Sequence, residues 1–200
     1  MSARADGEQQ HSTSATLLDR ARDRDSVAWD RLVQLYSPLV HYWCQRWGCR
    51  PENRDDVVQE VMLAVSRSLG NFRKENPGDS FRGWLRGVAR NTLLAQLRRD
   101  NKQPQGTGGS EALLRIHEVA DSIDTAEEDP PEQLGGLHRR ALELVRGEFQ
   151  PNTWQMFWQT VVEGRNPVDI AADLCVSPAA VRMAKSRVLR RLKEEFDGLI

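Results

Sequence analysis

The stretch at residues 167–194 constrains the fold more than any other part of the chain, because it carries two helix-start signals separated by a tight turn. Pro167 suits the first position of one helix, while Ser177 and Pro178 suit the N-cap and the first position of another. Apolar side chains then recur every three or four residues along the second helix, at Val181, Ala184, Val188 and Leu192. The stretch therefore predicts two amphipathic helices joined by a turn at 175–177.

The opposite side of the second predicted helix is basic. At 100° per residue it carries Arg182, Met183, Ser186, Arg187 and Arg190, and the segment 182–193 contains six Lys or Arg residues and no acid. A helix, a short turn and a second helix with a basic outer face are typical of a DNA-reading helix-turn-helix. An ordinary helical hairpin with a solvated basic face has the same pattern, so this stretch alone leaves both interpretations open.

Charge is unevenly distributed along the chain, although the net charge is only −1. Residues 15–100 carry a net charge of +4 and residues 134–200 carry +2, whereas residues 101–133 carry −6. Two mildly basic blocks on either side of an acidic connector suit a protein that touches nucleic acid in two places.

Composition argues against secretion, membrane insertion and enzymatic chemistry. The cysteines Cys44, Cys49 and Cys175 form neither a paired framework nor a metal-ligand spacing, which favours a reduced, cytoplasmic setting. The N-terminus has no apolar signal-peptide core, and the longest apolar run, 61–65, is too short to span a bilayer. The histidines are scattered, and no catalytic or metal-binding pattern groups them. We therefore expect a soluble protein that is not an enzyme and holds no cofactor or metal.

Strand signals are almost absent, so the sequence predicts an all-α protein. Residues 1–13 have the composition of a disordered tail, and Ser14 is a plausible N-cap for a first helix that ends near Asp25. A second helix is expected over 26–50, which Pro38 should kink or interrupt.

Two small helical domains are expected, at 14–100 and 134–200, joined by a flexible linker at 101–133 that is rich in Gly, Pro and acid. One short helix is predicted within the linker, around 113–119. The core of the second domain is predicted from a dense aromatic and aliphatic set: Phe149, Trp154, Phe157, Trp158, Val161 and Val162.

A third helix is predicted from Asn53 onward, with Asn53 as its N-cap. Its polar residues Asp56, Gln59 and Glu60 are spaced at i, i+3 and i+4, so they share a face away from the apolar stripe. Helix capping explains Asp56, but it explains neither Gln59 nor Glu60. These two residues are candidates for contact with a partner.

A fourth helix is predicted over 80–99, after a turn-rich and partly basic connection at 70–79. It contains five arginines, no acid, and the aromatic residues Phe81 and Trp84. A basic helix with aromatic residues beside a loop suits single-stranded nucleic acid, where bases stack on rings and arginine follows the phosphates. The alternative is that both rings are buried, and we expect Trp84 at least to be mostly core.

Three motifs, in this order, resemble the bacterial RNA polymerase sigma factors, specifically the extracytoplasmic-function (ECF) group of the sigma-70 family. The segment 56–60 resembles the family's polymerase-clamp helix, 81–91 its promoter-melting helix, and 167–193 the helix-turn-helix that reads the upstream promoter element. The resemblance covers residues 15–100 and 134–196. Each motif alone is weak, whereas the ordered triple is specific.

This resemblance implies a sigma factor that directs core RNA polymerase to promoters, with −35 readout in duplex DNA and −10 melting. It implies that polymerase binds at Asp56, Gln59 and Glu60. It implies that the promoter is melted by Phe72, Lys74, Ser80, Trp84, Arg90 and Asn91. It implies that upstream DNA is bound by Ser177, Ala179, Arg182, Met183, Ser186, Arg187 and Arg190. The implied partners are core polymerase, through its clamp and flap, and promoter DNA; an anti-sigma factor is a further partner that the family admits.

A conventional dimeric helix-turn-helix regulator is the alternative, but it leaves the polar face at 56–60 and the long acidic linker unexplained. Two residues depart from the family pattern. Cys175 stands where a turn glycine is common, which leaves the conformation of that turn open. Ala95 stands where many members carry an acid, so family contacts are not carried past Asn91.

Overall fold

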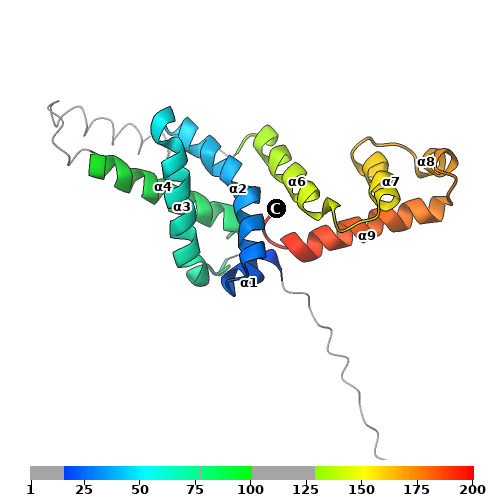
Figure 1. The fold of residues 1–200 in the computed structure, drawn as a ribbon, viewed down its shortest axis with the longest axis horizontal. Coiled ribbons are helices and arrows are strands. Elements are labelled where there is room, and N and C mark those ends of the chain that lie inside the picture. The colour runs from blue at the N-terminus through cyan, green and yellow to red at the C-terminus, as the bar shows by residue number, and fades with distance from the viewer. Residues whose placement is uncertain (1–15, 77, 101–128) are drawn as a thin grey trace, which may run out of the picture.

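The computed structural model describes residues 16–76, 78–100 and 129–200, and every regular element within these ranges is helical (Figure 1). The all-α prediction is confirmed. The predicted tail, the proposed Ser14 cap and the short helix expected around 113–119 lie outside the described residues.

The N-terminal half consists of α1 (Leu17–Arg22), α2 (Ser26–Arg46), α3 (Pro51–Ser68), a 3-10 turn (Leu69–Asn71) and α4 (Phe81–Asp100). Thr16 caps α1, because its hydroxyl accepts a hydrogen bond from the Asp19 backbone N–H at 3.3 Å. Asp25 caps α2 in the same way through the Val27 and Ala28 N–H groups, at 2.9 and 3.2 Å.

The structure differs from two predictions in this half, an interruption of the second helix at Pro38 and an N-cap at Asn53. Helix α2 runs through Pro38 without a break, because the buried residues Tyr36 and Leu39 on either side hold both turns against the core. Helix α3 begins at Pro51 rather than at an Asn53 cap, since proline suits the first helical position.

The C-terminal half consists of α6 (Pro131–Arg146), α7 (Pro151–Val161), α8 (Pro167–Asp173) and α9 (Pro178–Phe196). All four helices begin with proline. Ser177 caps α9 as predicted, because its hydroxyl accepts a hydrogen bond from the Ala180 N–H at 3.1 Å. Helices α8 and α9 therefore lie where the sequence predicts them.

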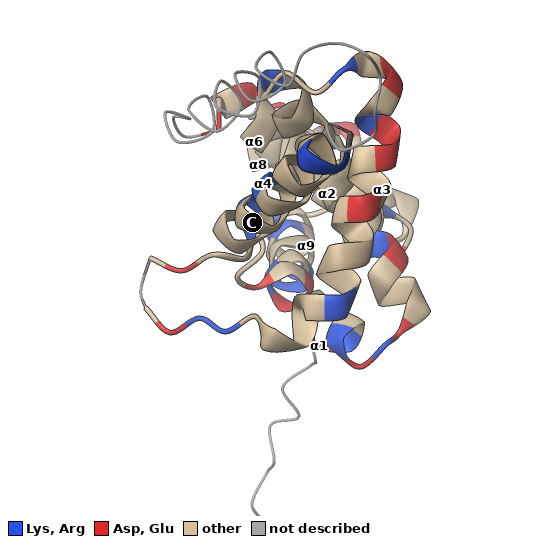
Figure 2. Cartoon of the chain, turned by 90° about the vertical axis from the view of Figure 1, so that its left-hand side faces the viewer, with Lys and Arg blue, Asp and Glu red and all other residues tan. Residues whose placement is uncertain are grey.

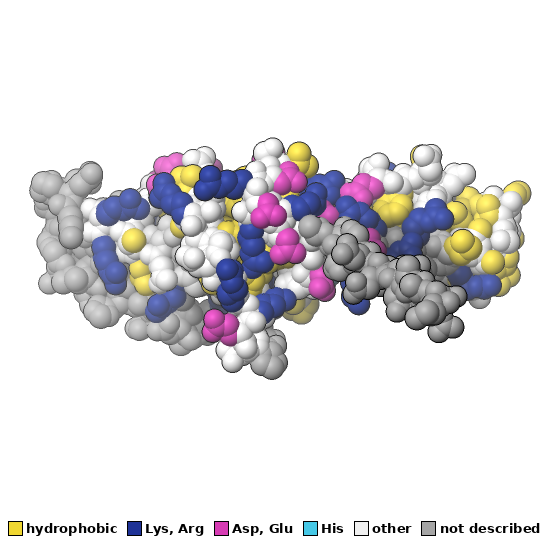
Figure 3. All heavy atoms as spheres, turned by 90° about the horizontal axis from the view of Figure 1, so that it is seen from below, with side chains coloured by type: hydrophobic (Ala, Val, Ile, Leu, Met, Phe, Trp, Pro, Cys, Tyr) yellow, Lys and Arg dark blue, Asp and Glu magenta, His cyan; other side chains and the backbone are white. Residues whose placement is uncertain are grey.

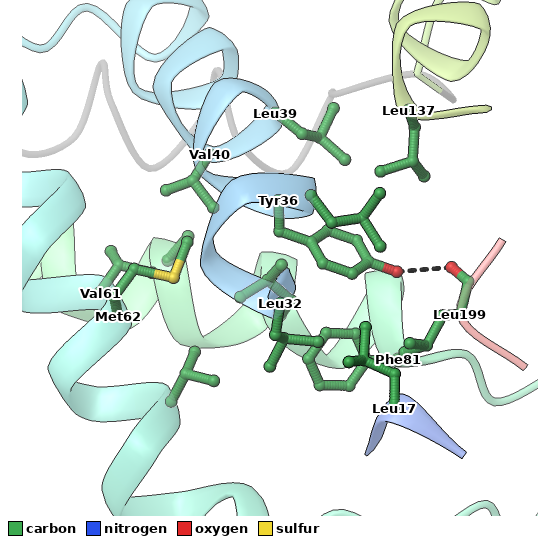
Figure 4. Close-up of a cluster of buried hydrophobic side chains, with 14 of the residues drawn as sticks. Leu17, Leu32, Tyr36, Leu39, Val40, Val61, Met62, Phe81, Leu137 and Leu199 are labelled. Atoms are coloured by element: carbon green, nitrogen blue, oxygen red, sulfur yellow. Dashed lines mark hydrogen bonds between the residues drawn. The ribbon is translucent and has the colours of Figure 1, made fainter. Parts of the chain in front are cut away.

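The apolar core continues from one half of the protein into the other. Tyr36 and Phe81 of the N-terminal half pack with Leu137 of α6 and Leu199 near the C-terminus (Figure 4). A second, smaller cluster holds α8 against α9 and α7: Met156, Ile170, Ala171, Val181 and Ala184. The sequence predicts two domains on a flexible linker, whereas this structure packs its two halves on a shared core.

Most of the predicted C-terminal core is confirmed, with two exceptions. Trp154 and Phe157 are buried, and Trp158 is partly buried against the same core. Val161 and Val162 are exposed, contrary to prediction, because α7 ends at Val161 and the chain then turns away.

The end of α9 joins the two halves through a cluster of charges. Glu195 is buried, and its carboxylate meets Arg20 of α1 at 2.5 Å, Arg31 of α2 at 2.8 Å and Arg191 of α9 at 2.9 Å. Glu148, in the α6–α7 connection, pairs with Arg31 at 3.1 Å and with Arg191 at 2.6 Å. Burial acts to raise the pKa of Glu148, but hydrogen bonds from Arg191 and Arg31 outweigh it and hold that pKa below its ordinary value.

Candidate nucleic-acid and partner interfaces

Helix α3 presents the predicted polar face to solvent. Asp56, Gln59 and Glu60 are all exposed, while Val57 and Val61 are buried against the core. Acidic residues recur along this helix in Figure 2. The geometry brings the three predicted residues together on one accessible face, since positions i, i+3 and i+4 of a helix are neighbours.

Leu63 lies on the same face and was missed by the sequence analysis. It is 50% exposed, one turn beyond Gln59 and Glu60, and outside the buried Val57/Val61 stripe. Leu63 adds exposed apolar area to this otherwise polar face. The sequence does contain a signal for Leu63. It follows Asp56 by seven residues, which is close to two helical turns, so the two side chains lie on the same face.

A pocket of about 390 Å³ lies between the 71–80 loop and the start of α4. Its lining residues are Asn71, Phe72, Arg73, Glu75, Gly78, Asp79, Ser80, Gly83 and Trp84. The loop is shaped by Asp79, whose carboxylate accepts hydrogen bonds from the Glu75 and Asn76 N–H groups, both at 2.9 Å. These two backbone donors lower the pKa of Asp79. The structure thus joins three predicted melting residues, Phe72, Ser80 and Trp84, around one pocket.

Phe72 and Ser80 also have structural roles that the sequence analysis did not predict. The Phe72 ring is 3% exposed, with its centroid 5.5 Å from that of Phe81 and 5.3 Å from that of Trp84. A ring packed in this way forms the pocket floor and does not project as a stacking platform. The Ser80 hydroxyl accepts a hydrogen bond from the Gly83 N–H at 3.0 Å and so caps α4.

Trp84 and Asn91 fall on one side of α4 at 100° per residue, about 10 Å apart along the axis. Trp84 is partly buried, as expected, and Asn91 is exposed. Arg90 lies on a different side of the helix and is partly buried. The structure therefore groups Asn91, but not Arg90, with the side of α4 that lines the pocket.

Lys74 lies directly against the C-terminal segment of the chain. Gly198 has φ +72°, and a Cβ built there would be 2.1 Å from the Lys74 ammonium nitrogen. The positive φ favours glycine at 198, whereas a Cβ there would only displace the end of the flexible Lys74 side chain. The predicted melting loop and the end of the chain, far apart in sequence, are neighbours in space.

Helix α9 exposes the predicted basic face over a shallow groove of about 440 Å³. Of the predicted residues, Arg182, Ser186 and Arg190 line it together, and Met183 beside them is 62% exposed. Ala179 and Arg187 are exposed at its edges, while Ser177 serves as the N-cap. The sequence analysis missed Lys185 and Leu189 as lining residues, and Lys193, at the end of the basic 182–193 segment, completes the lining. Figure 3 shows Lys and Arg side chains over both halves of one face of the molecule.

Arg191 belongs to the basic 182–193 segment but does not extend this exposed face. Its guanidinium is bound to Glu148 and Glu195 at the junction of the two halves. Hydrogen bonding to Glu148 raises the pKa of Arg191, against the opposing effect of burial. Because α9 repeats every 3.6 residues, Arg190 faces solvent while its neighbour faces the carboxylates.

The turn between α8 and α9 has a left-handed residue. Cys175 is exposed with φ +52°, a conformation that favours glycine. This settles the conformation that the sequence left open.

Among the residues described, no group of His, Cys, Asp and Glu side chains has the arrangement of a metal site. None of the helices in the described ranges is long and apolar enough to cross a membrane.

Comparison with known proteins gives one family match, to Sigma-70 region 2, over residues 32–103. The ECF RNA polymerase sigma factor SigE of Mycolicibacterium smegmatis is 26% identical over 191 residues, covering 91% of this chain and 67% of SigE. The RNA polymerase sigma factor CarQ of Myxococcus xanthus is 25% identical over 177 residues, covering 88% and 94% of the two chains. The RNA polymerase sigma factor CnrH of Cupriavidus metallidurans is 25% identical over 187 residues, covering 91% and 93%.

The family match spans α2 from Leu32 to the end of α4, the part that holds the predicted polymerase and melting residues. The relatives extend the similarity over about nine-tenths of the chain. The family match over residues 32–103 and these relatives together support a member of the sigma-70 family, in its extracytoplasmic-function group.

Proposed function

We propose that this sigma factor acts in transcription initiation by three separate surfaces of one chain. The exposed face of α3 binds core RNA polymerase, the pocket beside α4 holds unpaired bases of the −10 element, and α9 reads duplex DNA at the −35 element. The observation that carries the proposal is the arrangement of the three predicted motifs, each of which presents exposed residues on a different element.

Polymerase binding is assigned to Asp56, Gln59, Glu60 and Leu63, with the clamp as its target. Half-exposed Leu63 gives this polar face an apolar centre, and protein interfaces combine an apolar core with a polar rim. The flap is assigned to the C-terminal half, whose exposed apolar residues are Val161 and Val162 at the end of α7 and Val168 on α8.

Melting is assigned to the pocket that Trp84 and Ser80 line and to the exposed amide of Asn91. Extruding a base costs a few kcal/mol, which contacts in a protein pocket must offset. The partly exposed Trp84 offers stacking area, and the Asn91 side chain offers a donor and an acceptor.

The upstream element is assigned to the groove on α9. Arg182 lies near the helix N-terminus, where major-groove readers touch base edges, and arginine can pair both guanine acceptors at once. Arg190 and Lys193, further along, are assigned to phosphates.

Transcription in vitro tests the proposal. Core polymerase is supplied with a genomic DNA library, with and without this protein, and start sites are mapped. We expect discrete new start sites that share two upstream sequence elements. Asn91→Ala should lower transcription from duplex promoters more than from templates already mismatched at the start site, and Leu63→Ser should lower co-purification with core polymerase. A library without protein-dependent start sites would refute the assignment.

A dimeric helix-turn-helix regulator remains the competing function, and it predicts a stable dimer on a palindromic site. Sedimentation of the free protein separates the two, since the sigma-factor proposal requires no dimer.

A cytoplasmic location beside the polymerase follows from the proposal. We also propose that an anti-sigma factor binds this chain, a partner that the family resemblance admits.

A further inference from the structure

The carboxylate of Asp129 is buried in a site that the N-terminal half provides. Its side chain is 4% exposed, and Oδ1 accepts a hydrogen bond from Trp43 Nε1 of α2 at 2.6 Å. Two arginines of α4 complete the site: Arg82 Nε lies 3.4 Å from Oδ2, and Arg86 Nη1 lies 4.0 Å from Oδ1. The Arg86 guanidinium also lies 6.0 Å from the Trp43 ring centroid.

The chemistry of this site selects for an anion. The indole N–H can only donate, and each guanidinium brings a positive charge and further donors. Burying a carboxylate is costly unless charge and hydrogen bonds compensate it, and here both come from Trp43, Arg82 and Arg86. Arg82 and Arg86 are four residues apart on α4, so they project from the same side of the helix. Two guanidinium groups and a neutral donor around one oxyanion suit a phosphate as well as they suit a carboxylate.

Asp129 belongs to the other half of the protein. Asp129 is followed by Pro130 and then by Pro131, the first residue of α6. Its position depends on contacts that hold α6 and α9 against the N-terminal half, including the 2.9 Å hydrogen bond from Arg140 Nε to the Leu35 carbonyl. If the halves separate, Asp129 leaves and the three donors lose this buried partner.

We propose that Asp129 is an internal substitute for a nucleic-acid phosphate, and that Trp43, Arg82 and Arg86 bind a backbone phosphate of promoter DNA once Asp129 has left. The proposal rests on the proposed function, in which α4 engages an unpaired DNA strand. In the free protein the carboxylate competes with DNA for these donors. Separation of the halves on a promoter removes the competitor and creates the phosphate site in one step.

The test uses the full-length protein and a fluorescent thymidine oligonucleotide, with affinity measured by anisotropy across a NaCl series. Asp129→Asn keeps the acceptor for Trp43 but removes the charge that holds the arginines. We expect tighter binding at low salt and a plot of log K against log [NaCl] steeper by about 1.4, since each arginine released to a single strand adds about 0.7. Asp55→Asn is the matched control, because it also removes one negative charge, an exposed carboxylate on α3, without freeing Arg82 or Arg86.

The same substitution in an Arg82→Ala/Arg86→Ala background should give no steeper slope, which assigns the gain to these two residues. A purely structural Asp129 would lower the melting temperature in Asp129→Asn and leave the slope equal to that of Asp55→Asn, which would overturn the proposal. Start-site mapping with wild-type protein is unaffected by that outcome, so a failure here is distinguishable from a failure of the proposed function.

Discussion

The phenolic hydroxyl of Tyr36 donates a hydrogen bond to the backbone carbonyl of Leu199 at 2.5 Å, inside the apolar core (Figure 4). Tyr36 lies in the middle of α2, and Leu199 is the penultimate residue of the chain. This contact and the Glu195 cluster hold the C-terminal end against the N-terminal half.

Tyr36→Phe should lower the free energy of unfolding by about 1–3 kcal/mol, because the Leu199 carbonyl is left buried without its donor. Denaturant unfolding at pH 7 measures the change. Tyr42→Phe is the matched control. The Tyr42 hydroxyl accepts an exposed hydrogen bond from Arg46 at 3.2 Å, so its loss should change the free energy of unfolding very little. Equal effects of the two substitutions would contradict the structure.

Burial also raises the pKa of Tyr36. The folded state therefore holds the phenolic proton more tightly than the unfolded chain does, where the tyrosine pKa is about 10. The contribution of Tyr36 to stability is complete below that pH and declines as the pH rises above it. The difference between wild type and Tyr36→Phe should accordingly shrink in alkaline buffer.

Neighbouring glutamates at the end of α9 should respond very differently to neutralisation. Glu195→Gln leaves three arginines without their shared buried carboxylate and should cost about 3 kcal/mol. Glu194→Gln removes only a 3.9 Å surface pair with Arg190 and should cost well under about 1 kcal/mol. Thermal unfolding of the two variants side by side gives the answer, and similar melting temperatures would show that Glu195 is not held as described.

Cys175→Gly should stabilise the α8–α9 turn by up to about 1 kcal/mol, because glycine adopts φ +52° without the strain of a Cβ. The gain is limited by the greater freedom of glycine in the unfolded chain. Cys175→Ala keeps the Cβ and should give no gain, which separates backbone strain from loss of the thiol. A melting temperature of the glycine variant at or below that of the alanine variant would argue against a strained turn.

The three thiols should differ sharply in reactivity. Burial is the main cause that raises the pKa of Cys44 to about 12, so about one such thiol in ten thousand is ionised at a pH of about 8. Cys49 is also buried, whereas Cys175 is exposed. Titration of the native protein with a disulfide reagent should show one fast equivalent that Cys175→Ser abolishes. Fast labelling that persists in Cys175→Ser would mean that the α2 region opens readily.

Arg190→Ala and Arg191→Ala separate DNA contact from folding within one turn of α9. Arg190 lines the exposed groove, so its loss should reduce the salt dependence of duplex binding by about one unit. Arg191 is bound to Glu148 and Glu195, so its loss should lower the melting temperature and leave the salt slope unchanged. If Arg191→Ala instead lowered the salt slope and Arg190→Ala lowered the melting temperature, Arg191 would have to dissociate from its carboxylates when DNA binds.

Local patterns in the sequence were sufficient to predict most of the helices and the exposed faces of α3 and α9. Proline and cap residues mark helix starts wherever they occur, and a stripe repeating every 3.6 residues specifies which face is buried. The family resemblance came from the same short motifs. An interruption at Pro38 and a cap at Asn53 are absent from the structure, because packing or a neighbouring proline outweighed the local preference.

Only the tertiary structure decided what the charged and aromatic residues do between distant parts of the chain. Glu195, Asp129 and Arg191 look like ordinary solvated charges in the sequence. In the structure Glu195 and Asp129 are each paired with arginines of the N-terminal half, and Arg191 is bound to Glu148 and Glu195 at the junction of the halves. Phe72 becomes a buried pocket floor because Phe81 and Trp84 close over it, and Lys74 meets Gly198 at the opposite end of the chain. Periodicity carries information about neighbours within one helix, whereas these contacts depend on how separate helices pack, and no local pattern encodes that arrangement.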